Sequence, residues 1–142
     1  MNALNQIKTV IFPVAGIGSR FLPVTKTVPK ELLPILNIPL IEYAVNEARE
    51  AGIERFIFVS SPEKQSITDY FKKDKKLESY LKNKNSDLLI GLEKNFISDD
   101  SLIEVVQEEP LGLGHAIWCA RDYIDGPFAV ILPDDLIISK VA

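Results

Sequence analysis

The sequence has a single cysteine, Cys119, so no internal pair of thiols exists to form a disulfide. It also lacks an apolar run of membrane-spanning length and a secretory h-region near its start. We therefore expect a cytoplasmic protein with no membrane partner. Acidic side chains outnumber basic ones by 20 to 16, which leaves no excess of positive charge for nucleic acid. No nucleic-acid partner is expected.

Two common phosphate-binding motifs are incomplete. Gly16 and Gly18 supply the first two glycines of the dinucleotide fingerprint, but Phe21 stands where the third belongs. Pro23 and Pro29 also prevent a regular helix directly after the loop. Neither glycine is followed by the Lys-Ser or Lys-Thr pair of a P-loop. Both motifs are thereby excluded.

What the sequence does contain is an apolar strand that breaks into a glycine loop, in VIFPVAGIGSRFLPVTKTVPKELLP (residues 10–34). Glycines allow close approach to a ligand, and successive N–H groups in such a turn form a cradle for an anion. Three cations, Arg20, Lys26 and Lys30, follow the loop. A proline-braced loop with separated cations favours a triphosphate ligand.

The alternation of apolar runs and helical spacing predicts an α/β fold with a doubly wound, mostly parallel sheet. The strands buried on both faces are expected at Thr9–Val14, Arg55–Ser60, Leu102–Val106 and Phe128–Leu132. The helices are expected at Pro39–Ala51, Pro62–Phe71 and Leu113–Tyr123, with one or two surface helices in residues 75–92. Ligands bind such sheets beyond the carboxyl ends of the strands, where the glycine loop and Pro133-Asp134-Asp135 should meet.

Three segments resemble the sugar-1-phosphate nucleotidylyltransferase family, and its uridylyl-transferring branch above all. The long segment AGIGSRFLPVTKTVPKELLPI (residues 15–35) matches nearly every fixed position of the family signature. Gln107 with GLGHA (residues 112–116) and VILPDD (residues 130–135) match two later segments. The resemblance covers essentially the whole chain and implies a Rossmann-like nucleotidyltransferase fold.

The resemblance also implies a reaction and its partners. A uridylyl group would pass from UTP to glucose-1-phosphate, giving UDP-glucose and pyrophosphate with Mg²⁺ as cofactor, in an enzyme that forms a homo-oligomer at full length. Family members are about twice as long, so residues 1–142 are expected to be the N-terminal nucleotide-binding part of a truncated fold, without the sugar-binding half. A thymidylyl- or other nucleotidylyltransferase, and a nucleotide-binding fragment without turnover, stay open as alternatives.

The resemblance assigns roles to particular residues. Arg20 and Lys30 would contact the phosphates as catalytic cations, and Asp134 would bind the metal. Nucleotide-binding roles fall on Ala15, Gly16, Gly18, Glu31, Gln107, Gly112 and Gly114. A side-chain amide such as that of Gln107 offers a donor and an acceptor, which match the N3–H and a carbonyl oxygen of uracil.

Several roles remain undecided from the sequence. Lys26 is as well explained by a surface position as by a phosphate contact, and Asp134 could instead cap the turn after its strand. A phosphate monoester is already mostly dianionic at neutral pH, so the proposed attack needs no general base. His115 is therefore expected to have a structural or orienting role rather than a catalytic one.

Overall fold

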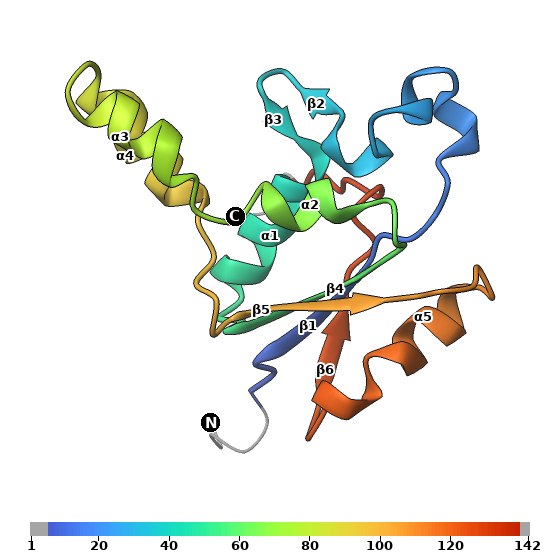
Figure 1. The fold of residues 1–142 in the computed structure, drawn as a ribbon. Coiled ribbons are helices and arrows are strands. Elements are labelled where there is room, and N and C mark those ends of the chain that lie inside the picture. The colour runs from blue at the N-terminus through green and yellow to red at the C-terminus, as the bar shows by residue number, and fades with distance from the viewer. Residues whose placement is uncertain (1–5, 140–142) are drawn as a thin grey trace.

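The structure, a computed structural model, describes residues 6–139. Its centre is a four-stranded sheet in the order β5-β4-β1-β6, in which every neighbouring pair is parallel (Figure 1). The strands are β1 (Thr9–Pro13), β4 (Arg55–Ser60), β5 (Leu102–Val106) and β6 (Phe128–Val130). All four lie where the apolar runs of the sequence predict them.

Helices cover both faces of the sheet. Helix α1 (Leu40–Glu50) lies on one face and α5 (Leu113–Cys119) on the other, and α2 (Gln65–Asp69) lies on the same side as α1 (Figure 1). This arrangement confirms the predicted α/β doubly wound fold. A 3-10 turn at Arg121–Tyr123 follows α5.

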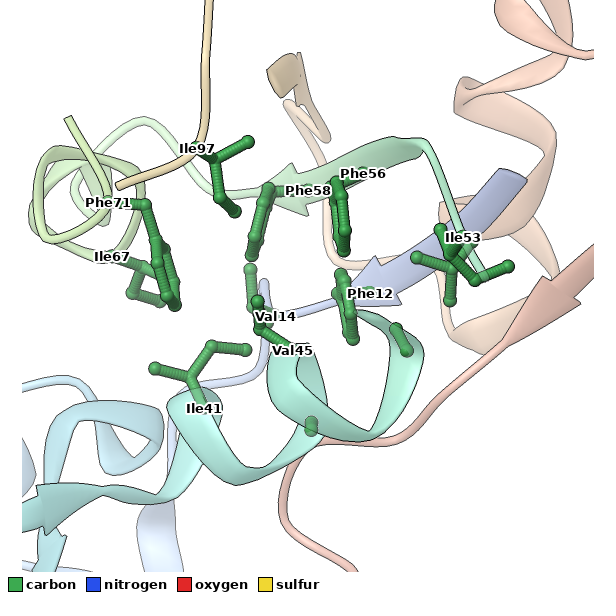
Figure 2. Packing of buried hydrophobic residues seen from close by; sticks show 13 residues of the cluster. Phe12, Val14, Ile41, Val45, Ile53, Phe56, Phe58, Ile67, Phe71 and Ile97 are labelled. Atoms are coloured by element: carbon green, nitrogen blue, oxygen red, sulfur yellow. The ribbon is translucent and has the colours of Figure 1, made fainter. Parts of the chain in front are cut away.

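The larger core lies between the sheet and α1. Phe12 and Phe58 stack with ring centroids 5.0 Å apart, and Phe71 extends the stack from beyond α2 at 5.6 Å (Figure 2). Ile41 and Val45 of α1 pack against these rings, and all five side chains are fully buried. A smaller core on the other face joins the sheet to α5.

The segment between β1 and α1 contains short turns instead of a regular helix. Three 3-10 turns span Ser19–Phe21, Val24–Lys26 and Lys30–Leu32, and a small hairpin of β2 (Pro34–Ile35) and β3 (Ile38–Pro39) follows. Prolines restrict the backbone before and within these turns, which is why no α-helix follows the glycine loop. The exclusion of the dinucleotide fingerprint agrees with this geometry.

The charged stretch in the middle of the chain forms two helices. These are α3 (Lys75–Lys82), capped by Asp74, and α4 (Ser86–Asn95), capped by Asn85. The pair projects away from the sheet (Figure 1). Within residues 6–139, none of the helices combines the length and apolar character needed to cross a membrane.

Three sequence predictions need correction. Helix α2 begins at Gln65 rather than at Pro62, because residues 61–64 form a turn closed by the Lys64 N–H and the Ser61 oxygen at 3.0 Å. Helix α5 ends at Cys119, and Tyr123 is exposed rather than part of the buried face. Burial on both faces holds for β1 and β4 but is wrong for β5 and β6, which are edge strands and only partly covered.

Candidate active site

The candidate site lies beyond the carboxyl ends of the strands, near the boundary between β1 and β6. The chain leaves β1 toward β4 on one side and returns to β6 on the other, which makes this boundary the switch point of the sheet. Two neighbouring hollows of about 380 Å³ each open along the carboxyl edge of the sheet, and Ala15, Gln107 and Pro110 line both. That volume is within the usual range of small-molecule sites.

Lys30 and Asp134 both line the second hollow and contact each other there. The Lys30 Nζ donates to Asp134 Oδ2 at 3.0 Å, although 104 positions separate the two residues in the sequence. Burial by itself would raise the pKa of the Asp134 carboxyl, but the hydrogen bond and charge of Lys30 hold that pKa below its usual value. Asp134 is therefore a carboxylate at neutral pH, beside a cation that can also reach a phosphate.

The glycine loop packs closely against Lys30. Gly18 has φ +71°, and a Cβ built there would lie 3.0 Å from Thr25 Cγ2 and 3.3 Å from Lys30 Cβ. Thr25 Oγ1 donates to the Gly18 oxygen at 2.7 Å and fixes the same turn. A Cβ at Gly16 would approach Lys30 Nζ to 3.7 Å. Glycine is thus required at Gly18 for its backbone conformation and for space around the lysine.

A buried ion pair braces this loop from behind. Lys64 Nζ lies 3.2 Å from Glu31 Oε2 and donates to the Val14 oxygen at 3.1 Å, and it also donates to the Gly16 oxygen. Lys64 is 8% exposed and Glu31 only 1%. Burial raises the pKa of Glu31 above its ordinary value, and the charge of Lys64 opposes that rise. One ammonium group therefore ties the end of β1, the glycine loop and the Lys30–Leu32 turn together.

Sequence reasoning missed Lys64. The signal was available, because residues 61–64 follow the carboxyl end of β4, and such loops line the ligand crevice of a parallel sheet. Placing residues 62–71 in a helix hid that loop.

Gln107 extends from the end of β5 toward the turn before α5. Its Nε2 lies 3.2 Å from the Gly112 oxygen and 2.9 Å from His115 Nδ1. Gly112 has φ +99°, a conformation that favours glycine. The side chain of Gln107 is thus held by Gly112 and His115, two residues of the GLGHA segment.

The structure brings most of the predicted site residues to one place. The second hollow is lined by Ala15, Gly16, Lys30, Glu31, Gln107, Gly112 and Asp134, among others. Gly18, Arg20 and Gly114 line neither hollow. Gly18 lies behind Lys30, and Arg20 is exposed on the loop, where its charge adds to the lowering of the Asp134 pKa. Gly114 lies in the first turn of α5.

Among the described residues that line the second hollow, Asp134 is the carboxylate that lies 3.0 Å from the Lys30 ammonium and could hold a metal there. Residues 6–139 contain no group of three or more His, Cys, Asp or Glu side chains placed to hold a metal ion. Mg²⁺ commonly binds through one or two carboxylates together with substrate phosphates and waters. The donor set fits that mode, whereas a closed cage of protein ligands does not fit.

Comparison with known proteins gives consistent matches along the chain. The family model described as nucleotidyl transferase matches residues 8–142. The chain is 48% identical over 139 residues to a UTP–glucose-1-phosphate uridylyltransferase of Komagataeibacter xylinus, covering 96% of this chain and 49% of the relative. It is 44% identical over 135 residues to the protein of the same name from Bacillus subtilis, covering 94% and 46%.

A solved structure shows the same architecture. The UTP-bound UGPase from Acinetobacter baumannii superposes with a TM-score of 0.85 at 46% identity, over 90% of this chain and 46% of that one. The chain thus spans about half the length of the curated relatives it matches.

Proposed function

Because the chain belongs to the nucleotidyl transferase family, we propose that it is the nucleotide-binding half of an enzyme that transfers a uridylyl group from UTP to glucose-1-phosphate. The relatives at 44–48% identity carry that activity in their names, and one solved relative is UTP-bound. The observation that carries the proposal is the lining of the second hollow, which brings together groups from the glycine loop, the end of β5 and the segment after β6. There the Lys30–Asp134 pair faces a buried side-chain amide, that of Gln107.

The chemistry follows from these groups. An oxygen of the glucose-1-phosphate dianion attacks the α-phosphorus of UTP in line with the leaving group. The new P–O bond forms as the bond from the α-phosphorus to the bridging oxygen breaks, and pyrophosphate leaves. Because the attacking phosphate is already ionised, the protein's task is to position two anions and neutralise their charge. Lys30 provides a point charge beside the phosphates, and Arg20, on the exposed loop, provides a planar fork.

The cofactor belongs to the same proposal. Asp134, kept ionised by Lys30, is the residue that would hold Mg²⁺ together with phosphate oxygens. When bound, the ion would supply further positive charge to the phosphates. The cytoplasmic location and the homo-oligomeric state stay predictions.

Calorimetric titration tests the proposal directly. The folded chain is titrated with UTP, TTP and NADH, each with and without Mg²⁺. We expect UTP to bind, Mg²⁺ to strengthen its binding, and NADH not to bind, because the loop lacks the dinucleotide fingerprint. Absence of UTP binding by a chain shown to be folded would overturn the proposal.

A second candidate, nucleotide binding without turnover, is favoured by one finding: the chain spans about half of its relatives. Pyrophosphate release from UTP in the presence of glucose-1-phosphate separates the two. Binding with release supports the transferase activity in this chain, and binding without release assigns it nucleotide capture alone.

A further inference from the structure

Gln107 is a buried polar side chain between the two hollows of the candidate site. It is 5% exposed, and its backbone N–H donates to the Ser60 oxygen at 2.7 Å, which continues the pairing of β4 with β5. Both hollows include it in their lining. A buried amide beside a ligand space must satisfy its polar atoms within the protein or with the ligand.

The amide orientation is fixed by the Gly112 carbonyl. A carbonyl oxygen can only accept a hydrogen bond, so the atom 3.2 Å from it must be Nε2, and the amide oxygen must point elsewhere. The same carbonyl accepts from the Ala116 N–H at 3.1 Å at the start of α5, which holds it in place. One of the two amide hydrogens of Gln107 is thereby used.

His115 uses the other hydrogen. Its Nδ1 lies 2.9 Å from the same Nε2, and because Nε2 can only donate, Nδ1 must be the acceptor and the ring proton must be on the far nitrogen. Within residues 6–139, no donor reaches the Gln107 oxygen. The amide therefore presents only an acceptor to a ligand, and this differs from the sequence-based expectation of a donor and an acceptor together.

From this geometry we propose that His115 is a positioning residue for base selection: by holding the second amide hydrogen of Gln107, it restricts the site to bases with a ring N–H donor. Uracil has such a donor at N3, whereas cytosine has an acceptor there, which would face the amide oxygen. Thymine shares the N3–H, so this device separates UTP from CTP and not UTP from TTP. The inference rests on the proposed function, because it concerns the base of the nucleotide in the same hollow.

The test compares UTP and CTP affinities by calorimetry for the whole chain and three variants. Wild type should prefer UTP by about tenfold or more, since one hydrogen bond gained or lost is worth roughly that factor. His115→Leu removes the acceptor, frees an amide hydrogen for a ligand acceptor and should reduce the ratio by about fivefold to tenfold. His115→Asn can place its Oδ1 where Nδ1 was, and should restore the preference. Trp118→Leu removes the ring that stacks on His115 at 5.9 Å without touching Gln107, and should keep the wild-type ratio.

The ratio distinguishes positioning from a merely structural role. If His115 only supported the fold, His115→Leu would weaken both nucleotides equally and leave the ratio unchanged, and that result overturns the inference. Equal binding of UTP and CTP by wild type overturns it as well. Absence of any nucleotide binding by folded wild type overturns the proposed function itself, and the His115 assignment with it. Thermal unfolding of each variant verifies that the compared chains are folded.

Discussion

In the buried pair of Lys64 and Glu31, each side chain compensates the charge of the other. Glu31 is 1% exposed, so its charge has almost no water to stabilise it, and Lys64 is its ion-pair partner at 3.2 Å. Removing one member of such a pair typically costs about 3–5 kcal/mol, because the other charge stays buried without compensation. Loss of either partner should therefore destabilise the folded state, and loss of Lys64 should also remove its hydrogen bonds to the end of β1 and to the glycine loop.

We predict that Lys64→Met lowers the free energy of unfolding at neutral pH by about 3 kcal/mol or more. The substitution should also make the free energy of unfolding depend more strongly on pH. Burial already raises the folded-state pKa of Glu31, and loss of the Lys64 charge raises it further. A carboxyl whose pKa is raised on folding binds more protons in the folded state. Its stabilising contribution is therefore complete below the unfolded-state pKa and is lost as pH rises toward the folded-state value. Urea unfolding at a series of pH values measures this.

The matched control is the double variant Lys64→Met with Glu31→Gln. It lacks the Glu31 carboxyl, so the part of the pH dependence that Glu31 causes should be absent, and it should be more stable than Lys64→Met at pH 7. A single variant with no more pH dependence than the double one would show that Glu31 does not carry an uncompensated charge.

A second prediction for a single residue concerns Lys30. Lys30→Met should weaken UTP binding by about 10- to 100-fold, the value of one charged hydrogen bond, while uridine binds about as before. The reason is that Lys30 lies at the Asp134 end of the hollow, where the phosphates are expected, rather than beside Gln107. Calorimetry with the two ligands separates the effects.

Lys76→Met is the control, since it removes one exposed lysine from α3 and changes the net charge equally. The same Lys30 variant should raise the pKa of Asp134, because the hydrogen bond that lowers it is gone. Carboxyl NMR titration would show that rise. An equal loss of UTP and uridine affinity would contradict a phosphate role for Lys30.

At the scale of the elements, Arg49 of α1 helps to attach the α3–α4 pair. Arg49 donates to the oxygens of Lys94, Asn95 and Phe96 at 3.1, 3.2 and 3.0 Å, which satisfies carbonyls at the end of α4. Since the last carbonyls of a helix have no partners within it, these bonds both cap α4 and tie it to α1.

We predict that Arg49→Met lowers the free energy of unfolding by about 1–3 kcal/mol and speeds amide exchange in α3 and α4 more than in β1 and β4. Hydrogen-exchange mass spectrometry resolves the two regions. Arg55→Met is the control: Arg55 makes an exposed pair with Asp125 at 3.8 Å, and such pairs contribute about 0–1 kcal/mol. Uniform exchange changes along the chain would argue against a local anchoring role.

The sequence pattern predicted the positions of the strands better than their exposure. The apolar runs located β1, β4, β5 and β6 because strand formation follows local residue type. Whether a strand is central or at an edge depends on which strands pair, and the partial exposure of β5 and β6 could not be read from their composition. The same holds in the site. The loop motif indicated Lys30 and the VILPDD segment indicated Asp134. The Lys64–Glu31 ion pair joins segments distant in sequence, and the orientation of Gln107 depends on the backbone geometry of the turn at Gly112, so neither followed from residue type alone.

At the scale of the whole molecule, β6 is an edge strand of the sheet formed by residues 6–139. The Ile131 N–H donates to the Ile11 oxygen of β1 at 3.0 Å. Because alternate residues of a strand point their N–H groups in opposite directions, the backbone of Val130 faces away from β1. Phe128 and Val130 are partly exposed on this strand, and Ile137 and Ile138 beyond it are each 85% exposed. An edge strand beside exposed apolar side chains is a template for pairing with another chain.

We therefore predict that the chain self-associates through the β6 edge as its concentration rises. Val130→Lys should suppress this association, because a charge on an edge strand is costly to bury against a second copy. Sedimentation velocity at increasing concentration measures the effect. Leu88→Lys is the matched control: Leu88 is 58% exposed on α4, away from the sheet, and its replacement changes the net charge of −4 by the same amount. If both variants reduced association equally, the cause would be overall charge.

A chain that stays monomeric throughout would show that β6 is protected despite its exposure. Suppression by Val130→Lys alone would locate the contact at β6, the strand that Asp134 follows in the chain. Association and nucleotide binding would then be measured together on the same samples.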